Sequence, residues 1–535
     1  MKKSFLLLLV TLNFSLLTIT AQTNVSGFIN ANTTWNFAGS PYIVTGNILL
    51  SQGYTLTINP GVVVKFDSAK AIQIDGELIA IGNAANRITF TSNKPIPHPG
   101  DWGRIQFTDS CVAAVLDTAG NYISGSILKY CNVMYGGATM FMGEIEMQSS
   151  PPYFNHCNIN YSSMAGIYSY NTTFVFDTSS VRHCSHNGLT IFGGSNLTIQ
   201  RDTFEFNTPD GIAVSGAKVM NNYFVSNNAA IGAGDGSIIM NNYFENNLRC
   251  IGVSYFVDIE CNRFVNNTLG CIYMDDEIGG TTISHNIFIG NTSTGDFTIF
   301  KIDGMVTNLY FEDNYLGYNS SATGACCVFN TDIMNSYLHI NGNEFKNNWG
   351  TSIIKLFYPG VSISTINFLD MKNNDFLDPG QIEFYNDILY GSSNVTIDSN
   401  YWGSTSTAHL DSAVYDYFDD ATKSVVFYSP ILTSFVAVDT TCPPSILNTI
   451  PIINQQTTST IYPNPFSETA TITFNKPLHN PTLKIYNLYG QIVKQIKQPE
   501  AKEIIINRDN LINGFYFYEV DENSRRISSG KIIIE

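Results

Sequence analysis

An Asn recurs two positions before an aromatic or aliphatic residue through the middle of the chain. The pattern is clearest in "VMNNYFVSNN" from Val219, "IMNNYFENN" from Ile239 and "IECNRFVNN" from Ile259. The members of this series are Asn222, Asn242, Asn262, Asn286, Asn314, Asn343, Asn374 and Asn400. Their period of roughly 20 to 30 residues, with variable insertions, is typical of a solenoid, in which each repeat packs only on its neighbours.

The composition of each repeat predicts strands. Helical periodicity is absent, and β-branched and aromatic residues dominate. A second column of a small residue followed by an aliphatic one, such as Gly211-Ile212, comes six to eight residues after each aromatic. Each repeat therefore holds about three short strands with tight bends between them. Leucine-rich repeats share the period, but Leu is too sparse here, so the pattern predicts a β-helix with one rung per repeat.

A stacked ladder explains why the repeated residue is Asn. Rungs stack at the strand spacing of about 4.8 Å, which places each column residue directly above its equivalent. Stacked charges would repel each other inside a bend, whereas Asn donates to one rung, accepts from another and tolerates a left-handed backbone. Upstream, Asp202, Cys157 and Cys131 continue the column, and we expect Cys184 to fill the rung between. The alternative role for these Asn residues, as sugar or metal ligands, is the weaker interpretation.

These rungs resemble the right-handed parallel β-helix of the pectin-lyase-like superfamily, which carries such asparagine ladders. The resemblance extends from about Ile48 to Trp402. It includes opening segments such as "GYTLTINPGVVVKF" and "GDWGRIQF", and "NYWGS" from Asn400 where the helix closes. The fold class implied is all-β.

The segment from Thr460 to Glu535 is similar to a different family. "IYPNPF", "TLKIYNLYGQIV", "LINGFYFYEV" and "GKIIIE" resemble the C-terminal sorting domain of type IX secretion cargo in Bacteroidetes. The matching motif residues are Pro463, Asn464, Pro465, Gly490 and Gly514. The resemblance implies export by the type IX secretion machinery, followed by release or attachment at the outer-membrane surface. The strand and turn pattern alone predicts a small antiparallel β-sandwich, for which a carbohydrate-binding or fibronectin-like module is the alternative interpretation.

The predicted order of domains follows. Residues 1–21, with Lys2, Lys3 and a short apolar run, indicate a secretory signal peptide. The β-helix is predicted over 22–440, a nearly uncharged linker over 441–459 and the sorting domain over 460–535. No later segment approaches the length of about 20 apolar residues that a membrane-spanning helix needs, so we expect no transmembrane segment once the signal peptide is removed.

The charge distribution bears on the partners. Between Gln22 and Ser459 there are 16 basic and 36 acidic residues, a net charge of −20. A body this acidic repels nucleic acid and anionic membranes. We therefore expect neither to be a partner.

Side chains that point out of the helix are the candidate ligand contacts. In a strand such as "GIAVS" the Ile and Val point inward, so Ala213 and Ser215 point outward. Small residues continue there until Tyr273. The same alternation predicts an outward stripe over the C-terminal rungs, comprising Lys301, Asp303, Phe329, Thr331, Lys355, Phe357, Glu383 and Tyr385. Aromatic faces beside polar groups suit stacking on sugar rings. Alternatives are that an inserted loop covers this stripe, that Lys355 and Glu383 simply pair, or that a one-residue slip of register buries all of these residues.

The function hypotheses differ in class. Pectate-lyase relatives keep calcium-binding carboxylates on the mid-helix face, where this chain has Gly, Ala and Ser, and this departure puts lyase chemistry in doubt. The leading hypothesis is a non-catalytic binding or adhesion protein that contacts a glycan; the alternative is a polysaccharide lyase or glycoside hydrolase. No cofactor or resident metal is predicted. The run Asp275, Asp276 and Glu277 is a calcium-site hypothesis whose alternative is a solvated turn, and the pair His183 and His186 is a weaker metal candidate.

Overall fold

The computed structural model describes residues 22–118, 120–138, 142–170, 172–193, 197–275, 280–304, 308–331, 337–357, 369–390, 394–442, 459–487, 492–522 and 525–534. They divide into two compact units, one ending at Cys442 and one beginning at Pro443. The predicted signal peptide and most of the predicted linker lie outside the described residues.

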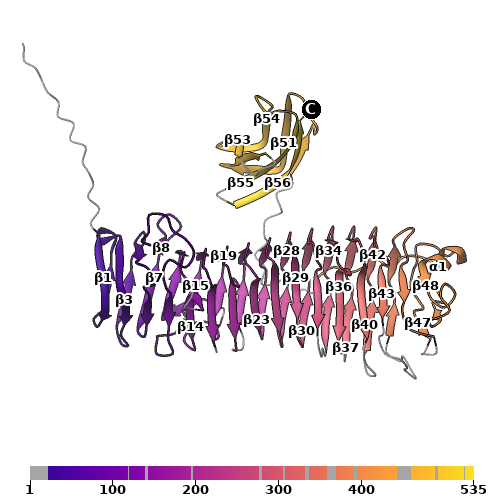
Figure 1. The fold of residues 1–535 in the computed structure, drawn as a ribbon, viewed down its shortest axis with the longest axis horizontal. Coiled ribbons are helices and arrows are strands. Elements are labelled where there is room, and N and C mark those ends of the chain that lie inside the picture. Colours follow the sequence, from indigo (N-terminus) through magenta and orange to yellow (C-terminus); the bar gives the residue numbers. More distant parts are fainter. Residues whose placement is uncertain are drawn as a thin grey trace, which may run out of the picture. The chain divides into compact units, whose positions relative to one another are not determined.

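The first unit is a parallel β-helix of about 13 turns (Figure 1). Each turn, or rung, contributes one strand to each of three faces. Face A is a 14-stranded sheet. Faces B and C together form one 29-stranded sheet, because the long strands of the first rungs run through both faces. The chain runs from face A through bend 1 to face B, through bend 2 to face C, and through a turn back to face A. The fold class predicted from the repeat is confirmed.

Most strands of face A alternate buried and more exposed residues, as the period of two predicts. They are β2 (Thr33–Trp35), β4 (Thr55–Ile58), β7 (Glu77–Ile81), β12 (Ile127–Lys129), β15 (Tyr153–Asn155), β18 (Val175–Asp177), β21 (Leu197–Gln200), β24 (Ala217–Met220), β27 (Ser237–Met240), β30 (Val257–Glu260), β33 (Thr281–Ser284), β37 (Asn308–Glu312), β41 (Tyr337–Asn341) and β44 (Leu369–Lys372).

Face B follows bend 1, and most of its strands are three residues long. They are β1 (Thr23–Ile29), β3 (Tyr42–Leu50), β5 (Val63–Phe66), β8 (Ile88–Ser92), β13 (Cys131–Met134), β16 (Asn158–Asn160), β19 (Ser180–Arg182), β22 (Thr203–Glu205), β25 (Tyr223–Val225), β28 (Tyr243–Glu245), β31 (Arg263–Val265), β34 (Ile287–Ile289), β38 (Tyr315–Gly317), β42 (Glu344–Lys346) and β45 (Asp375–Leu377).

Face C follows bend 2. In the first rungs it consists of the second halves of β1 and β3, whose first halves belong to face B. Its other strands are β6 (Ile72–Ile74), β9 (Ile105–Phe107), β14 (Gly143–Gln148), β17 (Ala165–Tyr170), β20 (Leu189–Phe192), β23 (Asp210–Ser215), β26 (Ala229–Gly234), β29 (Arg249–Val253), β32 (Ile272–Asp275), β36 (Phe297–Gly304), β40 (Ala325–Thr331), β43 (Ile354–Phe357), β46 (Phe384–Asn386) and β48 (Val414–Tyr415). The short helix α1 (Thr407–Ala413) precedes the last of these. Outside the three faces lie η1 (Phe37–Gly39), β10 (Val115–Leu116), β11 (Tyr122–Ser124), β35 (Thr292–Ser293), β39 (Ser320–Ser321), β47 (Val395–Thr396) and β49 (Val426–Phe427).

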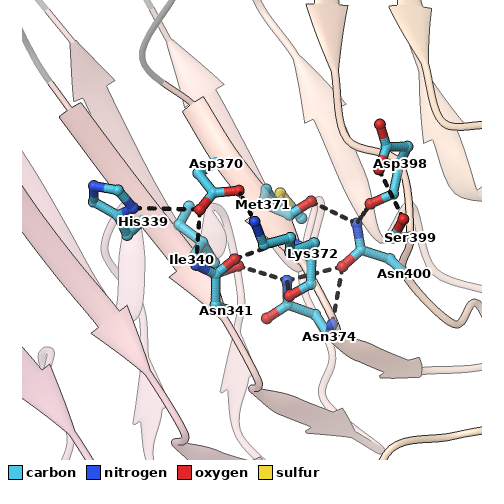
Figure 2. A network of polar contacts seen from close by, with 10 residues as sticks. All are labelled: His339, Ile340, Asn341, Asp370, Met371, Lys372, Asn374, Asp398, Ser399 and Asn400. Atoms are coloured by element: carbon cyan, nitrogen blue, oxygen red, sulfur yellow. Dashed lines mark hydrogen bonds and ion pairs between the residues drawn. The ribbon is translucent and has the colours of Figure 1, made fainter.

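The Asn series lines bend 1 as one continuous ladder from Asn222 to Asn400. Asn242 is representative: its backbone N and its Nδ2 donate to Oδ1 of Asn262 at 2.9 and 3.0 Å, and Nδ2 also donates to the carbonyl of Val219 at 2.8 Å. Each amide is buried and has partners both below and above, as a buried polar group requires. Figure 2 shows the last step, in which Asn374 donates to Oδ1 of Asn400.

A second ladder, which the sequence analysis missed, lines bend 2. Its Asn residues follow those of the first ladder by five positions, as Asn247 follows Asn242, and repeat the same pattern of donors. The members are Asn207, Asn227, Asn247, Asn267, Asn291, Asn319, Asn348 and, at the end, Asp378. The visible signal was the second Asn pair in segments such as "NNYFVSNN".

Two details of the predicted ladder are wrong. Ser179, not Cys184, fills the rung above Asp202: the backbone N of Ser179 donates to Oδ1 of Asp202 at 2.7 Å. Cys184 instead heads the second ladder, donating from its backbone N to Asn207. The left-handed conformation also belongs to the residue before each ladder position, since Asn221 and Asn241 have φ of +59° and +53°. That residue makes the bend, so the ladder side chain can point inward.

Stacked rings fill the core beside the first ladder. Phe204, Phe224, Phe244, Phe264 and Phe288 are fully buried, with ring centroids 4.6–5.1 Å apart from rung to rung. Further along, the Phe376 ring stacks on Trp402 at 4.5 Å. The fixed vertical spacing of the rungs sets this distance.

The second unit is antiparallel. One sheet has β50 (Ser459–Tyr462), β51 (Thr469–His479) and β54 (Glu500–Asn507), and the other has β52 (Thr482–Tyr486), β53 (Ile492–Lys497), β55 (Gly514–Glu522) and β56 (Arg525–Ile534). The two sheets enclose a separate apolar core that includes Phe466. Asn464 joins the first segment of this unit to its last strand: Nδ2 donates to the carbonyl of Lys531, and Oδ1 accepts from the backbone N of Ile533, both at 2.8 Å.

Candidate functional site

Face C presents one outward column that runs along the axis of the helix. The strand register stacks these side chains on successive rungs: Gln106, Glu146, Tyr168, Thr190, Ala213, Gly232, Gly252, Tyr273, Lys301, Val328, Lys355, Tyr385 and Tyr415. We call this the outer column. Its character changes along the axis, from polar and aromatic to small, and then to aromatic and charged.

The middle of the outer column is flat and uncharged. Ala213, Gly232 and Gly252 occupy three consecutive rungs. A Cβ added to Gly252 would have no neighbouring atom within 4 Å, and one added to Gly232 would come no closer than 3.8 Å to its neighbours. Packing of the fold therefore does not require Gly at these positions, and the carboxylate cluster of a lyase has no counterpart on these rungs.

The C-terminal third of face C carries the charged aromatic stripe, which we define as Tyr273, Lys301, Asp303, Lys355, Phe357 and Tyr385. All six side chains are partly exposed. Phe357 follows Asn330 and Asp303 in the column beside the outer column. The stripe thus contains three aromatic rings, two lysines and one carboxylate on the outside of the helix.

Lys301 is held between two carboxylates. Its Nζ lies 2.6 Å from Asp296 and 2.8 Å from Asp303, and 6.0 Å from the centre of the Tyr273 ring. Burial acts to lower the pKa of Lys301, but the hydrogen bonds to the two carboxylates outweigh it and raise that pKa. Partial burial acts to raise the pKa of Asp303, yet hydrogen bonds from Lys301 and Asn330 hold it below its usual value. Both groups are therefore charged near neutral pH.

Lys355 is the centre of a second polar group. Its Nζ lies 2.9 Å from Asp387 and 5.4 and 5.3 Å from the rings of Phe357 and Tyr385, distances that suit cation–π contacts. The Tyr385 ring stacks on Tyr415 at 4.6 Å. Asp387 and Tyr415 were not among the predicted residues, although Asp387 is two residues beyond Tyr385 and could have been found by continuing the alternation.

Phe329 and Glu383, two of the predicted contact residues, are buried, with 0% and 1% of their surface exposed. In β40, Val328 and Asn330 point outward and Phe329 faces the core, because the strand is one residue out of the predicted register. Glu383 precedes β46 and stacks on Ile353 in the buried column of small and aliphatic residues at bend 2. Lys355 consequently pairs with Asp387 and not with Glu383. The side chain of Thr331 lies outside the described residues.

Glu383 lies beside a second buried acid. Its Oε1 accepts from the backbone N of Asp378 at 3.2 Å, and one carboxyl oxygen of each residue has no hydrogen-bond partner. Burial raises the pKa of Asp378 to about 7 and that of Glu383 to about 9. These acids are enclosed in the core and cannot reach a ligand on face C.

A smaller aromatic group stands on the N-terminal side of the flat region. Tyr168, Tyr170 and Phe192 point outward from β17 and β20, and the last two are more than half exposed. Beyond them, Arg104 pairs with Glu146. The flat region is therefore bordered by aromatic side chains at both ends.

The other predicted sites contribute less. The side chain of His183 is stacked between the rings of Tyr161 and Phe206 at bend 2. Asp275 is exposed, and Asp276, Glu277 and Gly490 lie outside the described residues. Across the ranges that the structure describes, no three His, Cys, Asp or Glu side chains form a group that could hold a metal ion. Within the same ranges, no helix has the length and apolar character needed to cross a membrane.

Comparison with protein families gives three matches. The family described as "Right handed beta helix region" matches residues 106–229 and 165–314, and the "Pectate-lyase like beta helix domain" matches residues 27–141. The "Secretion system C-terminal sorting domain" matches residues 460–535. No curated protein gives a match to this chain.

Among solved structures, the periplasmic alginate epimerase AlgG is 12% identical over 73% of this chain and 78% of its own, with a TM-score of 0.23. A mutant of the same epimerase is 11% identical over the same shares, with a TM-score of 0.26. The full-length tailspike protein 2 of the Escherichia coli O157:H7 bacteriophage CAB120 is 8% identical over 96% of this chain and 64% of its own, with a TM-score of 0.21. At these values the likenesses carry no argument about function.

Proposed function

Because this chain is a secreted parallel β-helix protein with a type IX secretion C-terminal sorting domain, we propose that it binds an extracellular polysaccharide through the charged aromatic stripe of face C. The sorting domain indicates secretion or attachment at the cell surface and handling by the secretion machinery. The observation that carries the proposal is the group at Lys355, where one ammonium lies 5.4 and 5.3 Å from the partly exposed rings of Phe357 and Tyr385 on face C.

The arrangement suits a sugar ring. Aromatic groups bind the apolar parts of a sugar while their polar neighbours accept and donate hydrogen bonds to its hydroxyl groups. Tyr385 lies between Lys355 and Tyr415 on the neighbouring rungs, so it meets a ligand with its outer edge and not with a ring face. Phe357, Lys355 and Tyr385 come from adjacent rungs, so their relative positions are fixed by the register of β43 and β46. A site on strands is already in its bound arrangement, which lowers the entropy cost of binding.

The charges favour a neutral glycan. Lys301 lies between two carboxylates, and Lys355 shares the Asp387 carboxylate with Lys423, whose Nζ is 2.6 Å from it. The body of the protein has a net charge of −20, which repels a polyanion at ordinary ionic strength. A neutral polysaccharide would meet hydrogen-bonding groups without this repulsion.

Binding is favoured over cleavage by the state of the accessible acids. Glycoside hydrolysis needs a protonated acid and a carboxylate on opposite sides of the bond. Within the stripe, hydrogen bonds from Lys301 and Asn330 hold Asp303 ionised, while the neighbouring acids Asp378 and Glu383, whose pKa is raised, are buried. A lyase or hydrolase remains the alternative, and release of oligosaccharide during the binding experiment would support it.

The test is binding of the mature protein to a carbohydrate array, with matched variants. Phe357→Ala and Tyr385→Ala should each weaken binding roughly three- to tenfold, the range expected for one aromatic contact. Tyr318→Ala is the control, because Tyr318 is 60% exposed at bend 2, away from the stripe. If the stripe variants bind like the control variant, the stripe is not the contact surface.

A further inference from the structure

The segment after the last rung does not leave the helix at its end. Residues Ser429–Cys442, which we call the strap, return along bend 1 toward earlier rungs. The carbonyl of Pro430 accepts from the backbone N of Ser399, and the backbone N of Leu432 donates to Asn400. The backbone N of Val436 then donates to the Asp375 carboxylate at 2.9 and 3.0 Å, one rung earlier. Cys442 ends the strap in a disulfide with Cys261, several rungs nearer the middle of the helix.

Few other contacts hold the second half of the strap. Ile431 is the last strap residue that packs against the core of the helix. From Thr433 to Ala437 every residue is exposed, including Phe435 at 63%. Asp439 adds an electrostatic interaction with His285, on the rung after Cys261. Among the described residues, the disulfide is thus the one covalent cross-link between the strap and an earlier rung.

The disulfide determines where the chain leaves the β-helix. Cys261 precedes Asn262 at bend 1 and belongs to the most regular, shortest repeats. The described part of the first unit ends at Cys442, and the sorting domain follows after residues 443–458. The covalent path from the sorting domain therefore joins the helix at the Cys261 rung. The chain between the two cysteines, a sequence separation of 181, forms a closed loop beside that path.

We propose that the Cys261–Cys442 disulfide diverts force applied through the sorting domain into the middle of the helix, so that the C-terminal rungs carry none of it. In a solenoid each rung contacts only its neighbours, so an end pulled directly comes apart one rung at a time. Without the disulfide, a pull on the sorting domain would peel the strap and then the last rung. With it, the pull acts on bend 1 of a rung that has ladder neighbours on both sides. This inference is independent of glycan binding.

The test pulls the full mature chain in a single-molecule force instrument between its C-terminus and a handle attached at position 252 on face C, where an added side chain would meet no atom within 4 Å. This geometry leaves the N-terminal end of the helix without load. The chain length released on unfolding should be about 600 Å shorter in the oxidised protein than in Cys442→Ser. The disulfide keeps the 181 residues of the loop from extending, and each would add about 3.3–3.6 Å. The force of the first rupture should be higher in the oxidised protein. Reducing agent should convert the wild-type curve into that of the variant and should leave the variant unchanged.

Two results would overturn the proposal. Equal released lengths with and without reducing agent would mean that the disulfide does not form. A shorter released length with the same first-rupture force as Cys442→Ser would mean that the disulfide forms and the strap diverts no load. Cys442 is partly exposed at the end of the strap, so its substitution leaves the core of the helix intact.

Discussion

The middle and C-terminal rungs of the β-helix share one interior and differ in nearly everything else. From Asn222 to Asn262 successive ladder partners are 20 positions apart in the sequence, the bends are minimal and face C is flat. From Asn314 to Asn400 the partners are 26 to 31 positions apart, and face C carries lysines, carboxylates and rings. The ladders and the stacked rings continue through both regions. The interior is thus set by the stacking distance of the backbone, whereas the turns and the outward positions are free to vary.

The largest expected effect tests whether truncating a buried ring lowers the free energy of unfolding more than truncating a ring on the surface does. Phe264→Ala should lower the free energy of unfolding by about 3–5 kcal/mol, because it opens a cavity between two stacked rings. Phe264 lies 4.7 Å from Phe244 and 4.6 Å from Phe288 and is fully buried. Phe357→Ala, on the stripe, should cost less than about 1 kcal/mol. If the two variants shift the midpoint of chemical denaturation equally, the interior and the surface do not differ in this way.

The second prediction concerns the acids of the C-terminal rungs. The pKa of Glu383 is raised to about 9, so the folded protein keeps a proton that the unfolded chain loses above its ordinary pKa. Stability is therefore fully present at low pH and is lost as the pH rises toward 9. One pKa unit corresponds to about 1.4 kcal/mol, so the loss between pH 6 and 8 should be about 3 kcal/mol.

Glu383→Gln isolates this contribution. Burial also raises the pKa of Glu144 and Asp202, which lie nearer the N-terminus, so the wild-type curve contains several acids. Urea midpoints measured at pH 6 and 8 should differ less in the variant than in the wild type. Parallel curves would show that Glu383 is ionised in the folded state.

The third prediction concerns the ladder in the regular rungs. Asn242→Asp should lower stability by about 1–3 kcal/mol, because a carboxylate cannot donate to Asn262 or to the carbonyl of Val219. Asn246→Asp is the matched control, since Asn246 is exposed and makes bend 2 on the same rung with φ of +55°. Thermal melts near pH 7 should separate the two variants. A melt of Asn242→Asp that coincides with the control would mean that the ladder bonds contribute nothing net.

The sequence predicted the interior better than the surface, and the reason is physical. The first ladder is Asn on every rung from Asn222 to Asn400, and the column beside it stays apolar, with Leu316 in place of a ring on one rung, because each residue stacks directly on its equivalents. Phe329 shows the limit of this prediction, because a Phe can lie on either side of a strand. The insertions between Asn314 and Asn343 also hide where the strand begins, so inward and outward positions could not be counted from the ladder Asn. The outward side of the strands was predicted correctly at Lys355, because a lysine needs a position that is at least partly exposed. Phe357, two residues later in the same strand, and Tyr385, on the next rung, then share that side.

Long-range partners could not be predicted in the same way. The pairing of Cys261 with Cys442 joins a regular rung to a segment without repeats, at a sequence separation of 181. Ten scattered cysteines allow many pairings, and eight of them turn out to be buried free thiols. Glu383 was misplaced because its position before β46 belongs to bend 2, a boundary that alternation within a strand does not define.

The direction of the ladder bonds makes the two ends of the solenoid unequal. From Asn222 to Asn374, each residue of the first ladder gives its backbone N–H and a side-chain N–H to the next Asn of the ladder, as Asn242 does to Asn262. A helix shortened at its C-terminus would leave a backbone N–H and a side-chain N–H unpaired at each ladder. One shortened at its N-terminus would leave the Asn Oδ1 unpaired together with the second Nδ2 N–H, which donates to the preceding rung as Asn242 does to Val219, so that only the first case orphans a backbone N–H. Orphaned N–H groups are the rarer defect in proteins. Rungs can therefore be lost or duplicated at the N-terminal end at lower cost than at the C-terminal end.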